Sequence, residues 1–83
     1  MRQRVRVEVI GHLIYYFPET TRQGARVTTT VPSGTAVGYL PDLLKIPRHE
    51  IQAVLVNGVL VRDLATTLGP DDQVVILPIV SGG

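Results

Sequence analysis

The sequence predicts an α+β fold in which one main helix packs across one face of a mixed sheet of four to five strands. Three observations support this: strict alternation of apolar and charged residues near the start, an Asn-Gly pair between two β-branched runs, and a single stretch of helical spacing between the strands. The 83 residues are enough for one domain, near the lower limit of what a single hydrophobic core stabilises.

The first predicted strand is RVRVEVI, residues 4–10. Its residues alternate strictly, so we expect one buried and one charged face, with Val5, Val7 and Val9 against Arg4, Arg6 and Glu8. Residues 11–25 form a loose connection in which 12–17 can make one helical turn before Pro18. A second strand is predicted at 26–31, RVTTTV, where β-branched residues alternate again.

The helix is predicted after the break PSGT at 32–35, where Ser33 or Thr35 is expected to cap it. Apolar residues follow at helical spacing, namely Val37, Leu40 and Leu44. Pro41 lies on the same side and is expected to kink the helix near its middle, because proline lacks a backbone donor. Pro47 is expected to end the element.

A hairpin is predicted at residues 53–61, AVLVNGVLV. Asn57-Gly58 between two β-branched runs is typical of a two-residue type I′ turn. In the polar segment that follows, Leu64 and Leu68 are expected to anchor a short turn to the core. The last strand is predicted in QVVILPIV and ends at or near Pro78.

This order of elements favours a β-grasp, with the last strand parallel to the first at the centre of the sheet. The last strand should then alternate, but it is apolar on both faces. Val74 and Ile76 can face the helix, while Val75 and Leu77 point to the opposite face, as does Leu55. An exposed apolar patch indicates a binding surface. Coverage of that face by the loop at 11–25 is the alternative.

Composition excludes several function classes. The chain has no cysteine, which excludes a disulfide framework, a thiolate zinc site and a catalytic thiol. No apolar run reaches the roughly 18 residues of a membrane span, and MRQRVRVEV is not a signal-peptide pattern, so a cytoplasmic protein without a membrane partner is expected. A net charge of +1 argues against nucleic acid as a partner. His12 and His49 are the only histidines, and no metal site is expected.

The sequence ends in LPIVSGG, residues 77–83. Two glycines are costly to order, so residues 79–83 are expected to form a flexible tail after a domain that spans 1–78. Such an end is either an accident of truncation or cloning, or a feature that the protein uses.

The sequence resembles the ThiS/MoaD family of ubiquitin-like sulfur carriers, and among these it is closer to the molybdopterin synthase small subunit. The resemblance covers essentially the whole chain and is strongest at VLVNGVLV, 54–61, and at the residues that follow: Leu68, Asp72, Val74, Ile76, Pro78, Val80, Ser81, Gly82 and Gly83. The early GHL at 11–13 also fits. Ile79, GPDD at 69–72 and Pro41 depart from the family pattern.

The resemblance implies that the Gly83 carboxylate is adenylated with ATP by a ThiF/MoeB-like adenylyltransferase and converted to a thiocarboxylate, with Gly82 beside it. It implies a carrier rather than an enzyme, with no bound cofactor. The sulfur acceptor would be an enzyme such as a molybdopterin synthase large subunit or a thiazole synthase, within molybdopterin-type or thiamine biosynthesis. The residues expected to bind partners are Leu55, Val75, Leu77, Pro78, Ile79, Val80 and Ser81.

Two other interpretations remain open. A ubiquitin-like modifier would share the adenylation step but join Gly83 to lysines of other proteins. A β-grasp interaction module would carry an incidental tail, and removal of Gly82 and Gly83 would then leave its function intact.

Overall fold

The computed structural model describes residues 1–17 and 26–79. Its strands are β1 (Arg2–Val9), β2 (Arg26–Pro32), β3 (Ile51–Val56), β4 (Val59–Leu60) and β5 (Gln73–Pro78). One α-helix, α1 (Leu40–Leu44), is accompanied by the 3-10 helices η1 (Gly11–Tyr16), η4 (Val37–Tyr39) and η5 (Arg48–Glu50).

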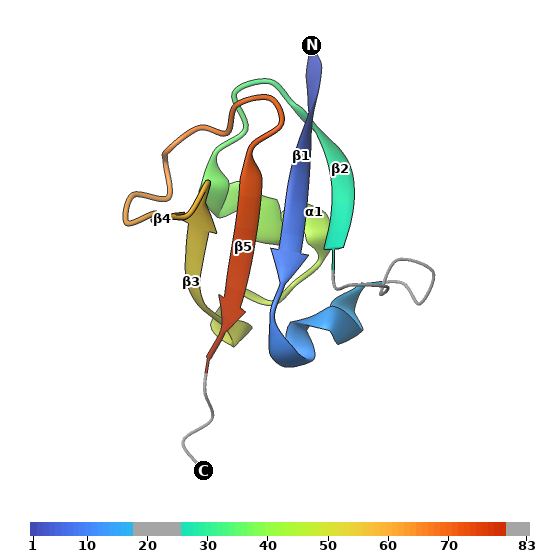
Figure 1. The fold of residues 1–83 in the computed structure, drawn as a ribbon, viewed down its shortest axis with the longest axis vertical. Coiled ribbons are helices and arrows are strands. Elements are labelled where there is room, and N and C mark those ends of the chain that lie inside the picture. The colour runs from blue at the N-terminus through green and yellow to red at the C-terminus, as the bar shows by residue number, and fades with distance from the viewer. Residues whose placement is uncertain (18–25, 80–83) are drawn as a thin grey trace.

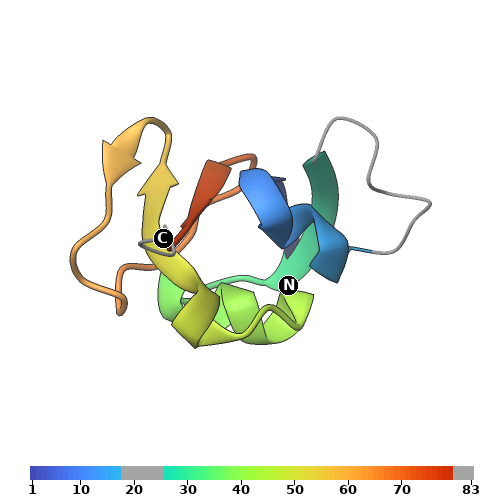
Figure 2. The same ribbon diagram turned by 90° about the horizontal axis from the view of Figure 1, so that it is seen from below.

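The five strands form one mixed sheet in the order β2-β1-β5-β3-β4 (Figure 1). The central pair, β1 and β5, is parallel, and the other neighbouring pairs are antiparallel. Seen from below, α1 lies on one side of the sheet, and the view of Figure 1 looks onto the opposite side (Figure 2). The β-grasp prediction, with the last strand parallel to the first at the centre, is therefore confirmed.

The hydrophobic core lies between the sheet and the helical segment. Val7 of β1 pairs with Val74 of β5, and Val9 pairs with Ile76, so these side chains point to the same face. Each of them is at most 1% exposed, and Leu40 of α1 is fully buried with them. The alternation seen in the sequence therefore selects the face that packs against the helix.

The helical segment differs from the prediction. It consists of the turn η4 followed by the five-residue helix α1, and Pro41 occupies the first turn of that helix. A proline in a first turn removes a donor that has no helical partner anyway, so the predicted kink in mid-helix was wrong. The helix also ends before Pro47, because Lys45 adopts a left-handed conformation with φ of 60°.

The predicted caps were also wrong. The residues that precede η4 and α1 are Ala36 and Tyr39, and neither makes a capping side-chain hydrogen bond. The Thr35 hydroxyl instead donates to the Pro32 carbonyl at 2.6 Å, within the turn that follows β2.

Two leucines that were expected to anchor the segment after β4 behave differently. Leu68 is 3% exposed and belongs to the core, whereas the Leu64 side chain is 53% exposed, so the prediction was wrong for Leu64. At Leu64 the chain is held through its backbone, because the Leu64 carbonyl accepts a hydrogen bond from the Gly38 amide at 3.0 Å.

The hairpin between β3 and β4 has the predicted two-residue turn. Val56 pairs with Val59, and the intervening Asn57 and Gly58 have φ values of 52° and 82°. Positive φ at both positions is the requirement of a type I′ turn. The Asn57 side chain also donates to Asp72 and accepts from the Gln73 amide, each at 2.9 Å, which joins the turn to the start of β5.

Replacement of Gly58 should lower stability through backbone strain alone. A Cβ built at Gly58 meets no atom within 4 Å, so Gly58→Val should cost about 1–2 kcal/mol from the left-handed conformation. Gly58→Ala and Gly69→Ala form a matched pair, because a Cβ at Gly69 makes only ordinary contacts and needs no positive φ. Thermal or urea unfolding should show the loss at Gly58 only, and equal stabilities of the pair would contradict the turn type.

Candidate functional site

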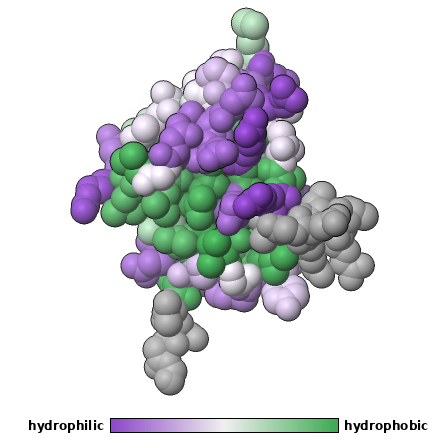
Figure 3. All heavy atoms as spheres, in the orientation of Figure 1, coloured by the Kyte–Doolittle hydropathy of each residue, from purple (hydrophilic) through white to green (hydrophobic). Residues whose placement is uncertain are grey.

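The side of the sheet without a helix carries an apolar surface over β3, β4 and β5 (Figure 3). Leu55 of β3 pairs with Val75 of β5 and with Leu60 of β4, and Leu77 lies two residues after Val75 on the same side of β5. We call Leu55, Leu60, Val75 and Leu77 the apolar face. Leu55, Val75 and Leu77 are half-buried, and Leu60 is 45% exposed.

The sequence-based prediction did not include Leu60, although the register of the predicted hairpin implies its position. A two-residue turn at 57–58 places residue 60 opposite residue 55, and therefore on the same face as Leu55. Ile10 was missed as well. It continues the outward row of β1, its amide donates to the Ile76 carbonyl at 3.1 Å, and it is 38% exposed. Ile10 thus extends the apolar face at the end of β1.

The loop that could have covered this face packs into the core in its described part, residues 11–17. Leu13 of η1 is fully buried and Phe17 is 4% exposed, and both belong to the core cluster. Residues 11–17 therefore leave Leu55, Val75 and Leu77 partly exposed. Residues 18–25 lie outside the described part of the chain.

The other half of the same face is charged. The outward residues of β1 and β2 include Arg2, Arg4, Arg6, Glu8 and Arg26. Glu8 pairs in register with both Arg26 and Val75, and the Arg26 guanidinium donates to the Glu8 carboxylate at 3.1 Å. This ion pair forms the border between the charged half and the apolar face.

Several contacts hold the chain at the end of β5. Pro78 pairs with Ile51, and the Ile79 amide donates to the Glu50 carbonyl at 3.0 Å. Gly11 has φ of 63°, and a Cβ there would lie 3.3 Å from Pro78, so glycine allows η1 to approach the end of β5. The His12 ring nitrogen lies 2.6 Å from the Glu50 carboxylate, which connects η1 to η5 at the same place.

Ile79 is the last described residue and is 37% exposed. Val80, Ser81, Gly82 and Gly83 lie outside the described residues, so the predicted roles of these four residues stay predictions. The same holds for the boundary between a domain at 1–78 and a tail at 79–83, and for partner binding by Leu55, Val75, Leu77, Pro78 and Ile79.

Within residues 1–17 and 26–79, no group of three or more histidine, aspartate or glutamate side chains is arranged to hold a metal ion. In that same part of the chain, none of the helices has the length and apolar character needed to cross a membrane.

One family model matches the chain. The model of the ThiS family matches residues 14–83. A search of curated protein sequences gives no significant match. Among solved structures, the chain is similar to SAMP1, the small archaeal modifier protein 1 of Haloferax volcanii. That match has a TM-score of 0.71 and 19% identity, and it covers 96% of this chain and 99% of SAMP1.

Two further similar structures are of molybdopterin-converting factor proteins. The putative molybdopterin converting factor subunit 1 of Pyrococcus furiosus has a TM-score of 0.66 and 21% identity, over 94% of this chain and 99% of its own. A chain of the complex of molybdopterin-converting factor subunits 1 and 2 from Helicobacter pylori has a TM-score of 0.58 and 20% identity. That match covers 98% of this chain and all of the other. At these identities the structural matches establish the fold.

Proposed function

The chain belongs to the ThiS family, and we propose that it is a sulfur carrier whose Gly83 carboxylate is activated and converted to a thiocarboxylate. The observation that carries the proposal is the continuity of β5. This strand supplies Val75 and Leu77 to the apolar face and then leads through Pro78 into the tail. Six residues follow Leu77 up to Gly83, and they span at most about 20–22 Å. Gly83 therefore lies within that distance of Leu77 and of a partner docked on the apolar face.

The chemistry needs no catalytic group from this chain. A carboxylate oxygen of Gly83, ionised at neutral pH, attacks the α-phosphate of ATP on the adenylyltransferase, and pyrophosphate leaves. The terminal sulfur of a persulfide donor then attacks the acyl carbon, and AMP leaves. A second thiol cleaves the sulfur–sulfur bond and releases the thiocarboxylate. The chain has no cysteine, so all of the sulfur comes from outside.

The carrier interpretation also gives the two glycines a purpose. Without a Cβ, Gly82 and Gly83 can pass through a narrow channel and present an unhindered carbonyl carbon to the incoming nucleophile. We propose a ThiF/MoeB-like adenylyltransferase as the first partner. The second would be a sulfur acceptor, such as a molybdopterin synthase large subunit or a thiazole synthase. The matched Helicobacter pylori structure is a complex of subunits 1 and 2 of molybdopterin-converting factor, which supports an acceptor of the molybdopterin synthase type.

A direct test combines the chain with the adenylyltransferase from the same organism, ATP, a persulfide donor and a reducing thiol. Intact-mass measurement should show one oxygen of the chain replaced by sulfur, and fragmentation should place the change at Gly83. Omission of ATP should leave the mass unchanged. The unreacted mass also establishes whether Gly83 carries the free carboxylate that the proposal requires. Absence of any product with a competent adenylyltransferase would contradict the proposal.

A second candidate function is that of a protein modifier. The similarity to the fold of SAMP1, a small archaeal modifier protein, favours this candidate. The same acyl-adenylate would give an amide if a lysine amine attacked it in place of sulfur. Lys45 is the chain's single lysine, and it lies exposed after α1, so self-conjugation would use it or the amino terminus. The intact-mass experiment separates the two functions, because an amide adduct adds the mass of a second protein.

A further inference from the structure

Two arginines on the sheet face beside the apolar face have no side-chain partner among the described residues. The Arg2 guanidinium donates to the Thr30 carbonyl at 2.9 Å, and Arg26 pairs with Glu8 at 3.1 Å. Arg4 and Arg6, on the same side of β1, make no side-chain hydrogen bond or ion pair with any residue of 1–17 or 26–79. Within this part of the chain, their charges are thus available to a partner.

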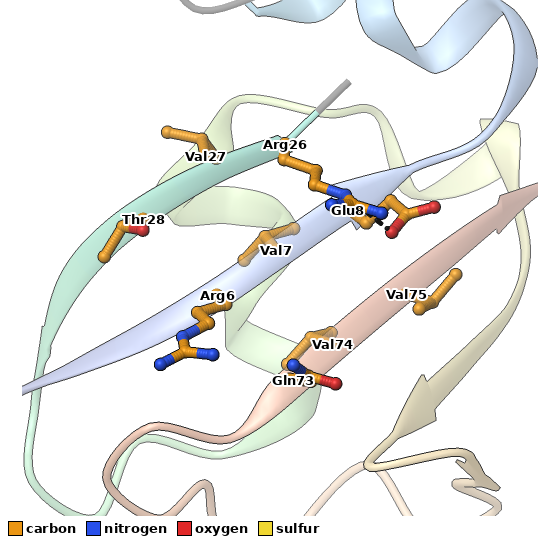
Figure 4. Close-up of a pocket in the computed structure, with 9 residues that line it drawn as sticks. All are labelled: Arg6, Val7, Glu8, Arg26, Val27, Thr28, Gln73, Val74 and Val75. Carbon is orange, nitrogen blue, oxygen red and sulfur yellow. Dashed lines mark hydrogen bonds and ion pairs between the residues drawn. The ribbon is translucent and has the colours of Figure 1, made fainter. Parts of the chain in front are cut away.

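Arg6 also lines a groove of about 320 Å³ across β2, β1 and β5 (Figure 4). Arg6 pairs in register with Thr28 on one side and with Gln73 on the other. The groove extends to Val75, which belongs to the apolar face, and the ion pair of Glu8 with Arg26 lines the groove at the level of Val75. Figure 4 shows Arg6 and Gln73 on neighbouring strands in this groove. The groove is therefore continuous with the apolar face.

A partner surface that spans both Val75 and the groove removes water from the Arg6 guanidinium. Loss of that water is unfavourable unless the partner supplies an anionic group in return. A carboxylate fits the planar donor array of a guanidinium, and the Thr28 hydroxyl and the Gln73 amide can donate to a further oxygen. Arg26 cannot take this role without giving up Glu8. The adjacent apolar residues favour a protein surface over a nucleic-acid backbone, which offers no apolar counterpart.

We propose that Arg4 and Arg6 make this face selective for a protein surface that presents aspartate or glutamate side chains beside an apolar patch, with one carboxylate in the groove at Arg6. The inference rests on the proposed function, because the adenylyltransferase is the partner to which it applies. Carboxylates opposite an arginine row also accelerate encounter, since complementary charges steer association at low ionic strength.

The test measures association rate constants between the chain and the adenylyltransferase from the same organism, by stopped-flow fluorescence, at low and at high salt. The parent rate should fall as salt rises. Arg6→Glu should reduce the low-salt rate about tenfold and weaken the salt dependence. Arg6→Gln should reduce it less, because it removes a charge without adding one of the opposite sign.

Arg62→Glu is the matched control. Arg62 is exposed in the segment after β4 and does not line the groove, and the substitution changes the net charge of the chain by the same amount as Arg6→Glu. We expect Arg62→Glu to change the low-salt rate less than about twofold. The melting temperature of each variant shows whether a change in the association rate comes from a loss of stability.

Three results would overturn the inference. Equal losses for Arg6→Glu and Arg62→Glu would show that net charge alone matters. Faster binding of Arg6→Glu would show that the partner surface is basic. A parent rate that does not depend on salt would also contradict carboxylates opposite the arginines. In each of these cases thiocarboxylate formation would still support the proposed function. If the parent neither binds the adenylyltransferase nor gains sulfur, the proposed function fails, and the inference fails with it.

Discussion

Deletion of Gly83 should abolish adenylation and thiocarboxylate formation while leaving the fold intact. The deletion moves the terminal carboxylate back by one residue, about 3.3–3.6 Å of extended chain, away from the α-phosphate of ATP. Reaction geometry tolerates a misplacement of about 1 Å before rates fall steeply, so even a bound tail would be out of range. Intact-mass measurement after incubation with the adenylyltransferase, ATP and the persulfide donor should show no sulfur on the shortened chain.

One residue appended after Gly83 should fail equally, because a peptide carbonyl would then occupy the place of the carboxylate. Gly83→Ala is the informative control. It keeps the carboxylate in register and adds a Cβ beside the reacting carbon, so activity should fall without being lost. All three variants should melt with the parent, since the core is made of residues between 5 and 76. Sulfur on the shortened chain would show that the carboxylate of Gly83 is not the working group.

Much of the fold could be predicted from the sequence because its signals are local and periodic. The alternation in residues 4–10 fixes which side of β1 faces the core, since a shift by one residue would bury the arginines. Asn57-Gly58 fixes the register of the hairpin, because the residues on either side of a two-residue type I′ turn must pair with each other. Here these residues are Val56 and Val59. Once these elements were placed, few sheet topologies remained.

The helical segment could not be predicted in detail, because its outcome depends on contacts between distant residues. The Gly38 amide donates a hydrogen bond to the Leu64 carbonyl, and the Val37 amide donates one to the Thr66 carbonyl at 2.8 Å. These bonds hold a 3-10 turn before α1, which moves Pro41 from the middle of a helix to its first turn. No pattern in residues 32–47 alone encodes partners that lie beyond residue 60.

The apolar face was predicted in outline but not in extent. Val75 and Leu77 could be identified from the sequence, because they are apolar residues on the face of the last strand that points away from the helix. The lack of a partner for Arg6 among residues 1–17 and 26–79 was not identifiable, because an arginine in an alternating strand is ordinarily a solvated residue. Recognition of the groove required the pairing of Arg6 with both Thr28 and Gln73 across three strands.

Leu77→Asp should weaken the complex with the adenylyltransferase far more than it lowers the melting temperature. Leu77 is half-buried on the side of the sheet opposite α1, and an interface there would bury the rest of its side chain. Burial of a leucine contributes up to roughly 1.5–3 kcal/mol, which corresponds to about a tenfold to hundredfold change in Kd. A carboxylate at this position adds the cost of its own desolvation, so the measured loss should reach at least the upper end of that range.

Leu64→Asp is the matched control, because it makes the same chemical change at a leucine that is 53% exposed and lies outside the apolar face. Its Kd should stay within about twofold of the parent if the apolar face is the docking surface. Isothermal titration calorimetry gives both affinities, and thermal unfolding of the free chains gives the stabilities. A large loss of stability in Leu77→Asp with unchanged affinity would place Leu77 in the core. Equal losses of affinity at the two leucines would show that the adenylyltransferase binds exposed apolar residues in general rather than the apolar face.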